Sequence, residues 1–183
     1  SETILDQDLS TLKKGGGVQD LIDRLRLQVG RLDVTPDELE GRNQRSALFK
    51  TMFLAFKSAG AKDWHSNLAI SLDHSGTQHR LQFHHVFPKA LLTKKAGMLA
   101  RDADDIANLA FIGGKTNRAI SDKAPSLYMP PLVQQHSQSF AAQAIPIASE
   151  LLGLESYKVF LAERRKLIAA RLNQFIGEPS AQV

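Results

Sequence analysis

The stretch from Leu81 to Asp122 constrains the fold most, because it holds two short apolar runs of strand character and then a polar, helix-forming segment. The first run, LQFHHVF, carries two adjacent histidines and is closed by Pro88. The second run, NLAFI (108–112), leads into a Gly-Gly turn and then into KTNRAISD (115–122), which reads as the start of a helix. This order of strand, loop, strand and helix predicts a small α+β unit.

Helical patterns account for most of the remaining chain. Apolar residues at helical spacing, together with residues typical of helix ends, predict helices over five segments: 18–29, from Thr35 onwards, 46–60, 88–97 and about 154–176. On the last of these we expect Arg164 and Arg165 to be surface charges or salt-bridge partners. The expected fold class is therefore α+β and mainly helical, with the small unit embedded in surrounding helices.

Glycine and proline predict the breaks between these segments. Residues 1–16 run into a Lys-Lys-Gly-Gly-Gly stretch and read as a flexible tether. We expect two extended runs around a turn at 75–76, the second of which includes the histidine pair, and the proline pair at 130–131 predicts a break. One compact domain is expected, in three parts: an N-terminal tether and helical lead-in (1–65), a core (66–135) and a C-terminal helical extension (136–183).

Composition and charge limit the classes of function. The chain has no cysteine, which excludes disulfides, zinc–thiolate sites and thiol catalysis. Its net charge is +4, and the window 79–129 alone has eight basic residues against four acidic ones. This asymmetry suits a surface that binds a polyanion, and a solvated basic face is the alternative. Because no apolar run is long enough to span a membrane and no signal-peptide pattern is present, we expect a cytoplasmic protein without a membrane partner.

The histidine pair and two downstream asparagines supply the parts that a one-metal nuclease needs. Such an enzyme requires a general base for water, and histidine suits that role because its pKa is ordinarily near neutrality. It also requires a divalent cation on the scissile phosphate, held by few protein ligands, and a group that orients the base. A packed pair of core histidines, and asparagines that only cap helices, are the alternatives.

The same residues resemble a known family. FHHVFPKALL (83–92), IANLAFIGGKTNRAISDKAPSLY (106–128) and, more loosely, the segment 144–176 are similar to an HNH endonuclease, which has a ββα-metal (His-Me finger) fold. In particular, these segments resemble the C-terminal HNH domain of GmrSD-type modification-dependent restriction endonucleases and their relatives in bacterial phage defence. It covers most of the chain.

The resemblance assigns a role to each residue of the array. It makes His85 the general base and Asn108 the amide that braces the loop holding this base, so these two form the catalytic group. It makes His84 and Asn117 the metal ligands. It implies one divalent ion, Mg²⁺, with Mn²⁺ or Ni²⁺ as alternatives.

One departure from the family pattern concerns the metal. Many HNH enzymes have an acidic residue at the position of His84, so this site would lack an anionic protein ligand. We therefore expect weak metal binding in the absence of DNA, and competition from softer cations.

The expected partner is DNA. Phosphate contacts are predicted for four basic residues around the array: Lys89, Lys115, Arg118 and Lys123. The resemblance also implies an upstream sensor or NTPase domain in a longer protein, and oligomers are possible. Two other readings stay open, namely a nucleic-acid-binding or protein-interaction module that keeps the fold but lacks activity, and a helical scaffold whose histidines only pack.

Overall fold

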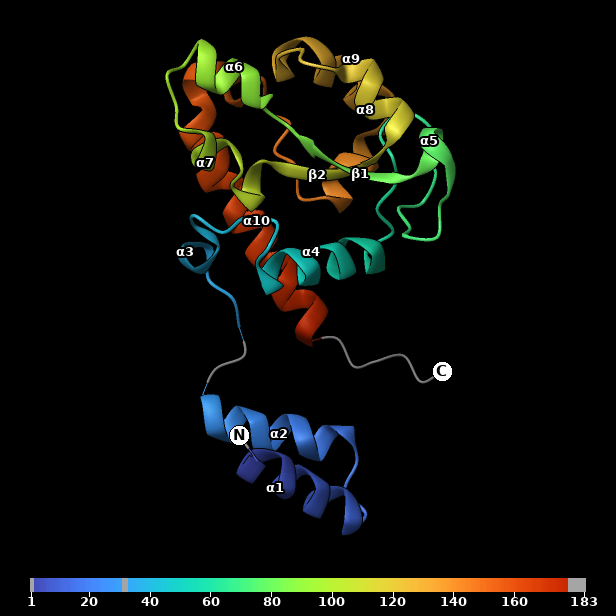
Figure 1. Cartoon of the computed structure of the whole chain (residues 1–183), viewed down its shortest axis with the longest axis vertical. Coiled ribbons are helices and arrows are strands. Elements are labelled where there is room, and N and C mark those ends of the chain that lie inside the picture. The colour runs from blue at the N-terminus through green and yellow to red at the C-terminus, as the bar shows by residue number, and fades with distance from the viewer. Residues whose placement is uncertain (1, 31–32, 178–183) are drawn as a thin grey trace. The chain divides into compact units, whose positions relative to one another are not determined.

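The computed structural model describes residues 2–30 and 33–177, and the chain divides into two compact units, Ser1–Asp33 and Val34–Val183 (Figure 1). The first unit consists of two helices, α1 (Glu2–Lys13) and α2 (Val18–Val29). The prediction of α2 is confirmed, but the predicted tether over 1–16 is wrong because α1 occupies it. Apolar residues at helical spacing were present there, and α1 packs on α2 through Arg24, whose guanidinium lies 2.6 Å from the Thr11 hydroxyl and 3.2 Å from Asp8.

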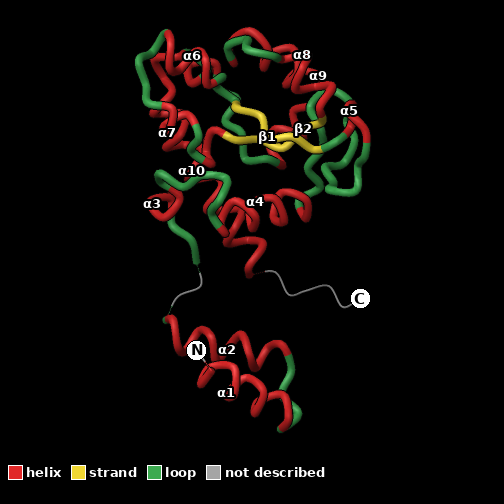
Figure 2. Tube along the Cα trace, viewed as in Figure 1, coloured by secondary structure: helices red, strands yellow, loops and turns green. Residues whose placement is uncertain are grey.

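The second unit is mainly helical around one small antiparallel sheet, which confirms the α+β class at this level (Figure 2). The strands are β1 (Leu81–His85) and β2 (Leu109–Gly113). The α-helices are α3 (Pro36–Leu39), α4 (Ala47–Ser58), α5 (Gly76–His79), α6 (Lys89–Lys94), α7 (Ala100–Ala103), α8 (Gly114–Ile120), α9 (Pro125–Ala142) and α10 (Tyr157–Gly177). Short 3-10 turns lie at Ile106–Asn108, Ser149–Leu151 and Leu154–Ser156. No helix within the described ranges is both long enough and apolar enough to cross a membrane.

The register of the sheet assigns side chains to its two faces. His84 is paired with Ala110, and His85 is paired with Leu109. Because neighbouring residues on a strand point to opposite faces, His85 shares its face with Phe83, and His84 shares the other face with Gln82.

Each face is covered by different helices (Figure 1). On the Phe83 face, helix α4 packs an aromatic cluster against the strands, with ring centroids 4.9 Å apart for Phe49–Phe83 and 5.1 Å apart for Phe49–Phe111. On the opposite face lie α8 and α9, and Tyr128 of α9 packs edge-on against the His84 ring. The sheet is thus the middle layer of the unit, and its strands are held by packing that two isolated strands would lack.

Two predictions differ from the structure, one on the extended runs around 75–76 and one on a helix break at Pro130 and Pro131. The second of the two expected runs forms a strand over Leu81–His85, but the first forms only an isolated bridge between Lys62 and Ala69, and Gly76–His79 is helical, so β1 pairs with β2. Helix α9 continues through Pro130 and Pro131 and loses helical geometry at His136 instead. Proline has a helical φ, but inside a helix it removes a hydrogen bond and its ring crowds the carbonyl of residue i−4; the buried side chains of this helix hold it against the core.

The predicted helix starts at Thr35 and around 46–60 are confirmed. Glu38 accepts hydrogen bonds from both the backbone N–H and the hydroxyl of Thr35, and the Ser46 hydroxyl caps α4 by accepting from Leu48 N–H. The helix expected from Pro88 forms as α6, and the long C-terminal helix forms as α10.

The Gly-Gly pair at the junction of β2 and α8 is closely packed. A Cβ at Gly114 would collide with the backbone oxygen of Thr77, and one at Gly113 would lie 3.3 Å from the Asp63 carboxylate. Asp63 accepts hydrogen bonds from Gly113 N–H and the Thr116 hydroxyl, both at 2.6 Å. Burial acts to raise the pKa of Asp63, but these and other hydrogen bonds lower it below its ordinary value. A buried carboxylate therefore fixes the direction in which α8 leaves the sheet.

Arg164 differs most from its expected surface position, because its side chain is fully buried. Its guanidinium donates to the backbone oxygens of Ala107 (2.9 Å) and Leu109 (2.8 Å), and to those of Ala144 and Gln143 at longer range. Burial lowers the pKa of Arg164 to about 9, so it stays charged at neutral pH. Arg164 thus joins α10 to the residues on either side of Asn108.

Candidate functional site

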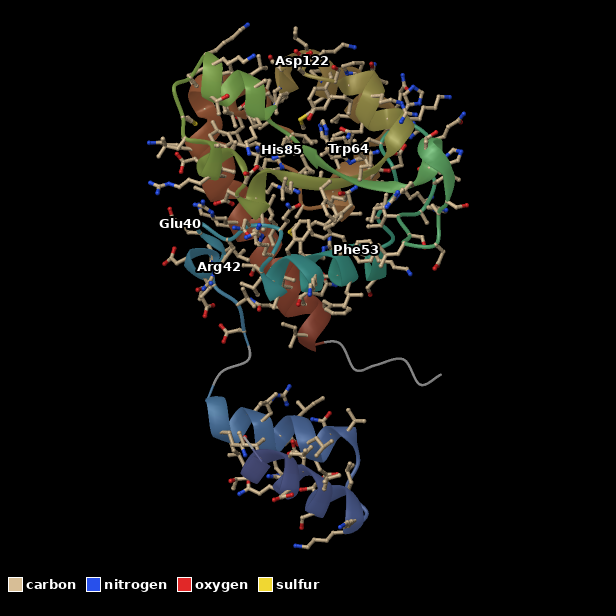
Figure 3. All side chains as sticks on the ribbon, in the orientation of Figure 1. Glu40, Arg42, Phe53, Trp64, His85 and Asp122 are labelled. Carbon is tan, nitrogen blue, oxygen red and sulfur yellow. The ribbon has the colours of Figure 1, made fainter. Side chains whose placement is uncertain are left out.

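A cavity of about 430 Å³ opens along the free edge of β1. Because it follows the edge of the sheet, it receives side chains from both faces, including His85 from one and Gln82 from the other. Figure 3 labels His85, the last residue of β1, and Phe53 on α4, the helix that covers one face of the sheet. The cavity is lined by Gln44, Arg80, Leu81, Gln82, Phe83, His85, Asp104, Leu109 and Asn117.

His84 lies behind this cavity and is buried between α8 and α9. Its Nδ1 is 2.8 Å from Oδ1 of Asn117, and its Nε2 is 3.3 Å from the Tyr128 hydroxyl. That hydroxyl donates to the backbone oxygen of Val86 at 2.9 Å, so it can accept a hydrogen bond from Nε2 when Nε2 carries the proton. Because the Asn117 oxygen can only accept, the 2.8 Å contact requires the proton of His84 on Nδ1, and an ion held between these two atoms would require it on Nε2 instead.

Burial keeps His84 neutral. Desolvation is the main cause that lowers its pKa to about 4, and the charges of His85 and Arg164 act in the same direction, against the hydrogen bond that His84 donates to Asn117. A neutral imidazole with a free nitrogen lone pair is the form that binds metal ions.

The pKa of His84 predicts how stability changes with pH. An unfolded histidine takes up a proton below about pH 6.5, whereas folded His84 does so only near pH 4, so stability falls as pH drops through this window. The shift corresponds to about 3 kcal/mol in the free energy of unfolding. In urea unfolding, His84→Gln should lose less stability than the parent between pH 7 and pH 4.5. Equal losses in the two proteins would contradict this assignment.

His85 contacts a different set of groups. Its Nε2 lies 3.0 Å from Oδ1 of Asp104, and Oδ2 of Asp104 accepts from Lys89 Nζ at 2.6 Å. The slight burial of Asp104 acts to raise its pKa, but the contacts with Lys89 and His85 lower it, so the carboxylate is ionised at neutral pH. Lys89, predicted to contact DNA, is therefore already paired with an acid beside His85.

Asn108 is fully buried and connects the loops on either side of the site. Its amide oxygen accepts from Phe87 N–H at 2.8 Å, and its amide nitrogen donates to the backbone oxygens of Phe87 (3.0 Å) and Ala103 (2.9 Å). Its own backbone oxygen accepts from Val86 N–H. This geometry suits a residue that holds the chain just after His85 in place.

Asn117 connects the two faces, because its side chain lines the cavity and also contacts His84. Its Oδ1 faces His84, and its Nδ2 donates to Oε1 of Gln82 at 2.7 Å, which fixes the orientation of the amide. A neutral imidazole nitrogen and an amide oxygen side by side fit the donor set of a weakly held divalent ion. No group of three or more His, Cys, Asp or Glu side chains placed to hold a metal occurs in the described part of the chain.

The basic residues predicted for DNA lie mostly on α8 and just beyond it. Lys115, Arg118 and Lys123 are exposed, and Arg118 donates to the Thr77 backbone oxygen at 2.9 Å. Arg80 was counted only as part of the basic window, yet it is exposed at the cavity.

Sequence reasoning also missed Asp104 and Tyr128. Asp104 lies four residues before Asn108 in an acidic stretch, RDADD, and nothing local distinguishes it from its neighbours. Tyr128 is at the end of the segment similar to the HNH family, but its contact with His84 depends on how α9 crosses the sheet.

Comparison of the chain with protein-family models, with curated protein sequences and with solved structures gave no match.

Proposed function

We propose that this chain is a metal-dependent DNA endonuclease whose β1–β2–α8 unit is a ββα-metal core of the HNH type. The observation that carries the proposal is the arrangement of four polar residues at one edge of the sheet. His85 and Asn117 line the same cavity, His84 contacts Asn117 from behind, and Asn108 fixes the loop after His85. In the sequence these residues are spread over more than one element, so their convergence is a property of the fold.

His85 is the general base in this proposal. Its Nε2 faces Asp104, and no hydrogen bond to its Nδ1 is formed by the residues that the structure describes. Nδ1 can therefore take a proton from a water molecule in the cavity. Asn108 supplies no chemistry of its own and acts by holding the backbone at Phe87.

His84 and Asn117 would hold the divalent ion. When bound, the ion would supply a Lewis acid for the phosphate and its developing charge. With the ion bound, the Tyr128 hydroxyl would accept a hydrogen bond from Nε2–H of His84 and so favour the tautomer with a bare Nδ1, a contact that metal-binding histidines commonly make. Because His84 and Asn117 are in direct contact and both are neutral, we expect weak binding of the ion without a phosphate.

Positive side chains around the cavity would bind the backbone of the substrate. Arg80 lies at the cavity, and Lys115, Arg118 and Lys123 extend the positive surface along α8 and beyond. Phosphate contacts of this kind give affinity that falls with salt concentration and carry no sequence preference.

A binding module of the same fold without activity is the second candidate, favoured by the missing acidic metal ligand. Supercoiled plasmid incubated with the protein in Mg²⁺, Mn²⁺ or Ni²⁺, beside a gel shift in chelator, separates the two. The nuclease proposal expects nicked or linear plasmid only with a divalent ion, and salt-sensitive binding in chelator. Binding with intact plasmid under every metal would refute the nuclease and support the binding module.

A further inference from the structure

Resting on the proposed function, we propose that Asp104 is a positioning residue that sets the tautomer and the orientation of His85. One carboxylate oxygen of Asp104 lies 3.0 Å from His85 Nε2, and the other lies 2.6 Å from Lys89 Nζ. An ionised carboxylate can only accept, so His85 must place its proton on Nε2. The nitrogen left to act as a base is then Nδ1.

The backbone around Asp104 is anchored on both sides, which distinguishes this pair from a surface salt bridge between two mobile side chains. On one side, the Ala103 backbone oxygen accepts from Asn108, and the Asp102 backbone oxygen accepts from the Tyr157 hydroxyl at 2.7 Å. On the other side, the buried Asp105 carboxylate accepts from Ala107 N–H at 2.8 Å and contacts Arg165 at 2.6 Å.

The side chain of Asn108 holds the backbone near His85 and the backbone near Asp104 together. The amide nitrogen of Asn108 donates to the backbone oxygen of Phe87, two residues after His85, and to that of Ala103, one residue before Asp104. Asn108 therefore fixes the base and its carboxylate relative to each other from within the core. Asn108 thus braces both the chain that follows His85 and the chain that precedes Asp104.

Lys89 makes an Asp104→Asn variant informative. The ammonium of Lys89 can only donate, so it should select the amide oxygen of the new asparagine. The amide NH₂ would then face His85 Nε2 and require it to accept. The proton of His85 would move to Nδ1, and Nδ1 could then no longer accept a proton from water. An Asp-to-Asn change in the serine-protease triad inactivates its histidine in the same way, by selecting the wrong tautomer.

Nitrogen-15 NMR of histidine-labelled protein in chelator reads this tautomer without any need for activity. The parent and Asp104→Glu should show a protonated Nε2 and a bare Nδ1 at His85, and Asp104→Asn should show the reverse. With plasmid and Mn²⁺, Asp104→Asn should lower kcat by roughly 10²-fold or more at unchanged KM, and Asp104→Glu should recover most of the rate. Asp102→Asn removes the same charge two residues away, without a contact to His85, and should match the parent in both measurements.

The outcomes separate this inference from the nuclease proposal. An unchanged His85 tautomer in Asp104→Asn, or an unchanged kcat, would overturn the positioning role even if the parent cuts DNA. A parent that cuts nothing would refute the nuclease, and with it the catalytic part of this inference. The tautomer measurement would still establish or refute the control of His85 by Asp104.

Discussion

The His85→Ala protein should be folded, should bind DNA as the parent does, and should cleave roughly 10²- to 10⁴-fold more slowly. His85 is the one histidine among the residues that line the β1 cavity, and the other proton acceptor there, the Asp104 carboxylate, is already paired with Lys89 and His85. Its side chain is only partly buried, at 30% exposure, so truncation should leave the core intact. Initial rates on a labelled duplex, with binding measured in chelator, test this prediction.

An exposed histidine provides the matched control. His65 loses the same ring in His65→Ala, but its side chain is exposed and lines no part of the β1 cavity. We expect His65→Ala to cut at the parental rate. If His85→Ala cuts as fast as His65→Ala, another residue is the base and the assignment of the histidine pair is wrong.

The largest effect on stability is expected from Arg164→Met. The substitution keeps an unbranched chain of similar length but removes every donor, and so leaves the backbone oxygens of Ala107 and Leu109 without the guanidinium that now satisfies them. Buried acceptors that lose a charged donor cost a few kcal/mol in total, so we expect the free energy of unfolding to fall by about 3–5 kcal/mol. Guanidinium chloride unfolding of the two proteins measures the difference.

Lys166→Met on the same helix serves as the control for this prediction. Lys166 is exposed and contacts only Glu163 among the described residues, at 2.6 Å, so its loss should change stability by no more than about 0.5 kcal/mol. A loss of less than about 1 kcal/mol in Arg164→Met would show that its hydrogen bonds to the backbone are replaced by water. The view of Arg164 as the link between α10 and the Asn108 region would then have to be abandoned.

The sequence allowed the main elements to be predicted because their signals are local. The periodicity of 18–29 and of 154–176, and the capping residues at Thr35, predicted helices that form as α2, α10 and α3. The wrong predictions arose where local signals conflicted with packing. Pro130-Pro131 read as a break, but α9 is held by the buried side chains of Tyr128, Met129 and Phe140. The run before β1 has strand character, yet it forms only an isolated bridge between Lys62 and Ala69, and the partner of β1 is β2.

The residues of the site divide in the same way, into those with a local signal in the sequence and those placed by tertiary packing. The four residues of the array could be chosen from their spacing and from the HNH resemblance, and the opposed directions of His84 and His85 follow from strand geometry. Asp104 and Tyr128 could not be chosen, since each contacts its histidine across a loop or helix whose path is set by tertiary packing. Arg164 was misplaced for a related reason, because its partners are backbone oxygens, which leave no pattern in the sequence.

The central claim, that His84 and Asn117 hold the ion with which His85 cuts DNA, is tested most directly by plasmid cleavage over a Mn²⁺ titration in the parent and in Asn117→Ala. Asn117→Ala removes the amide oxygen that lies 2.8 Å from His84 Nδ1. The account predicts cleavage by the parent that saturates with Mn²⁺, and a variant that needs at least roughly tenfold more Mn²⁺ for the same rate. Cleavage by both proteins at the same rate at every Mn²⁺ concentration, or by neither protein at any, would contradict it.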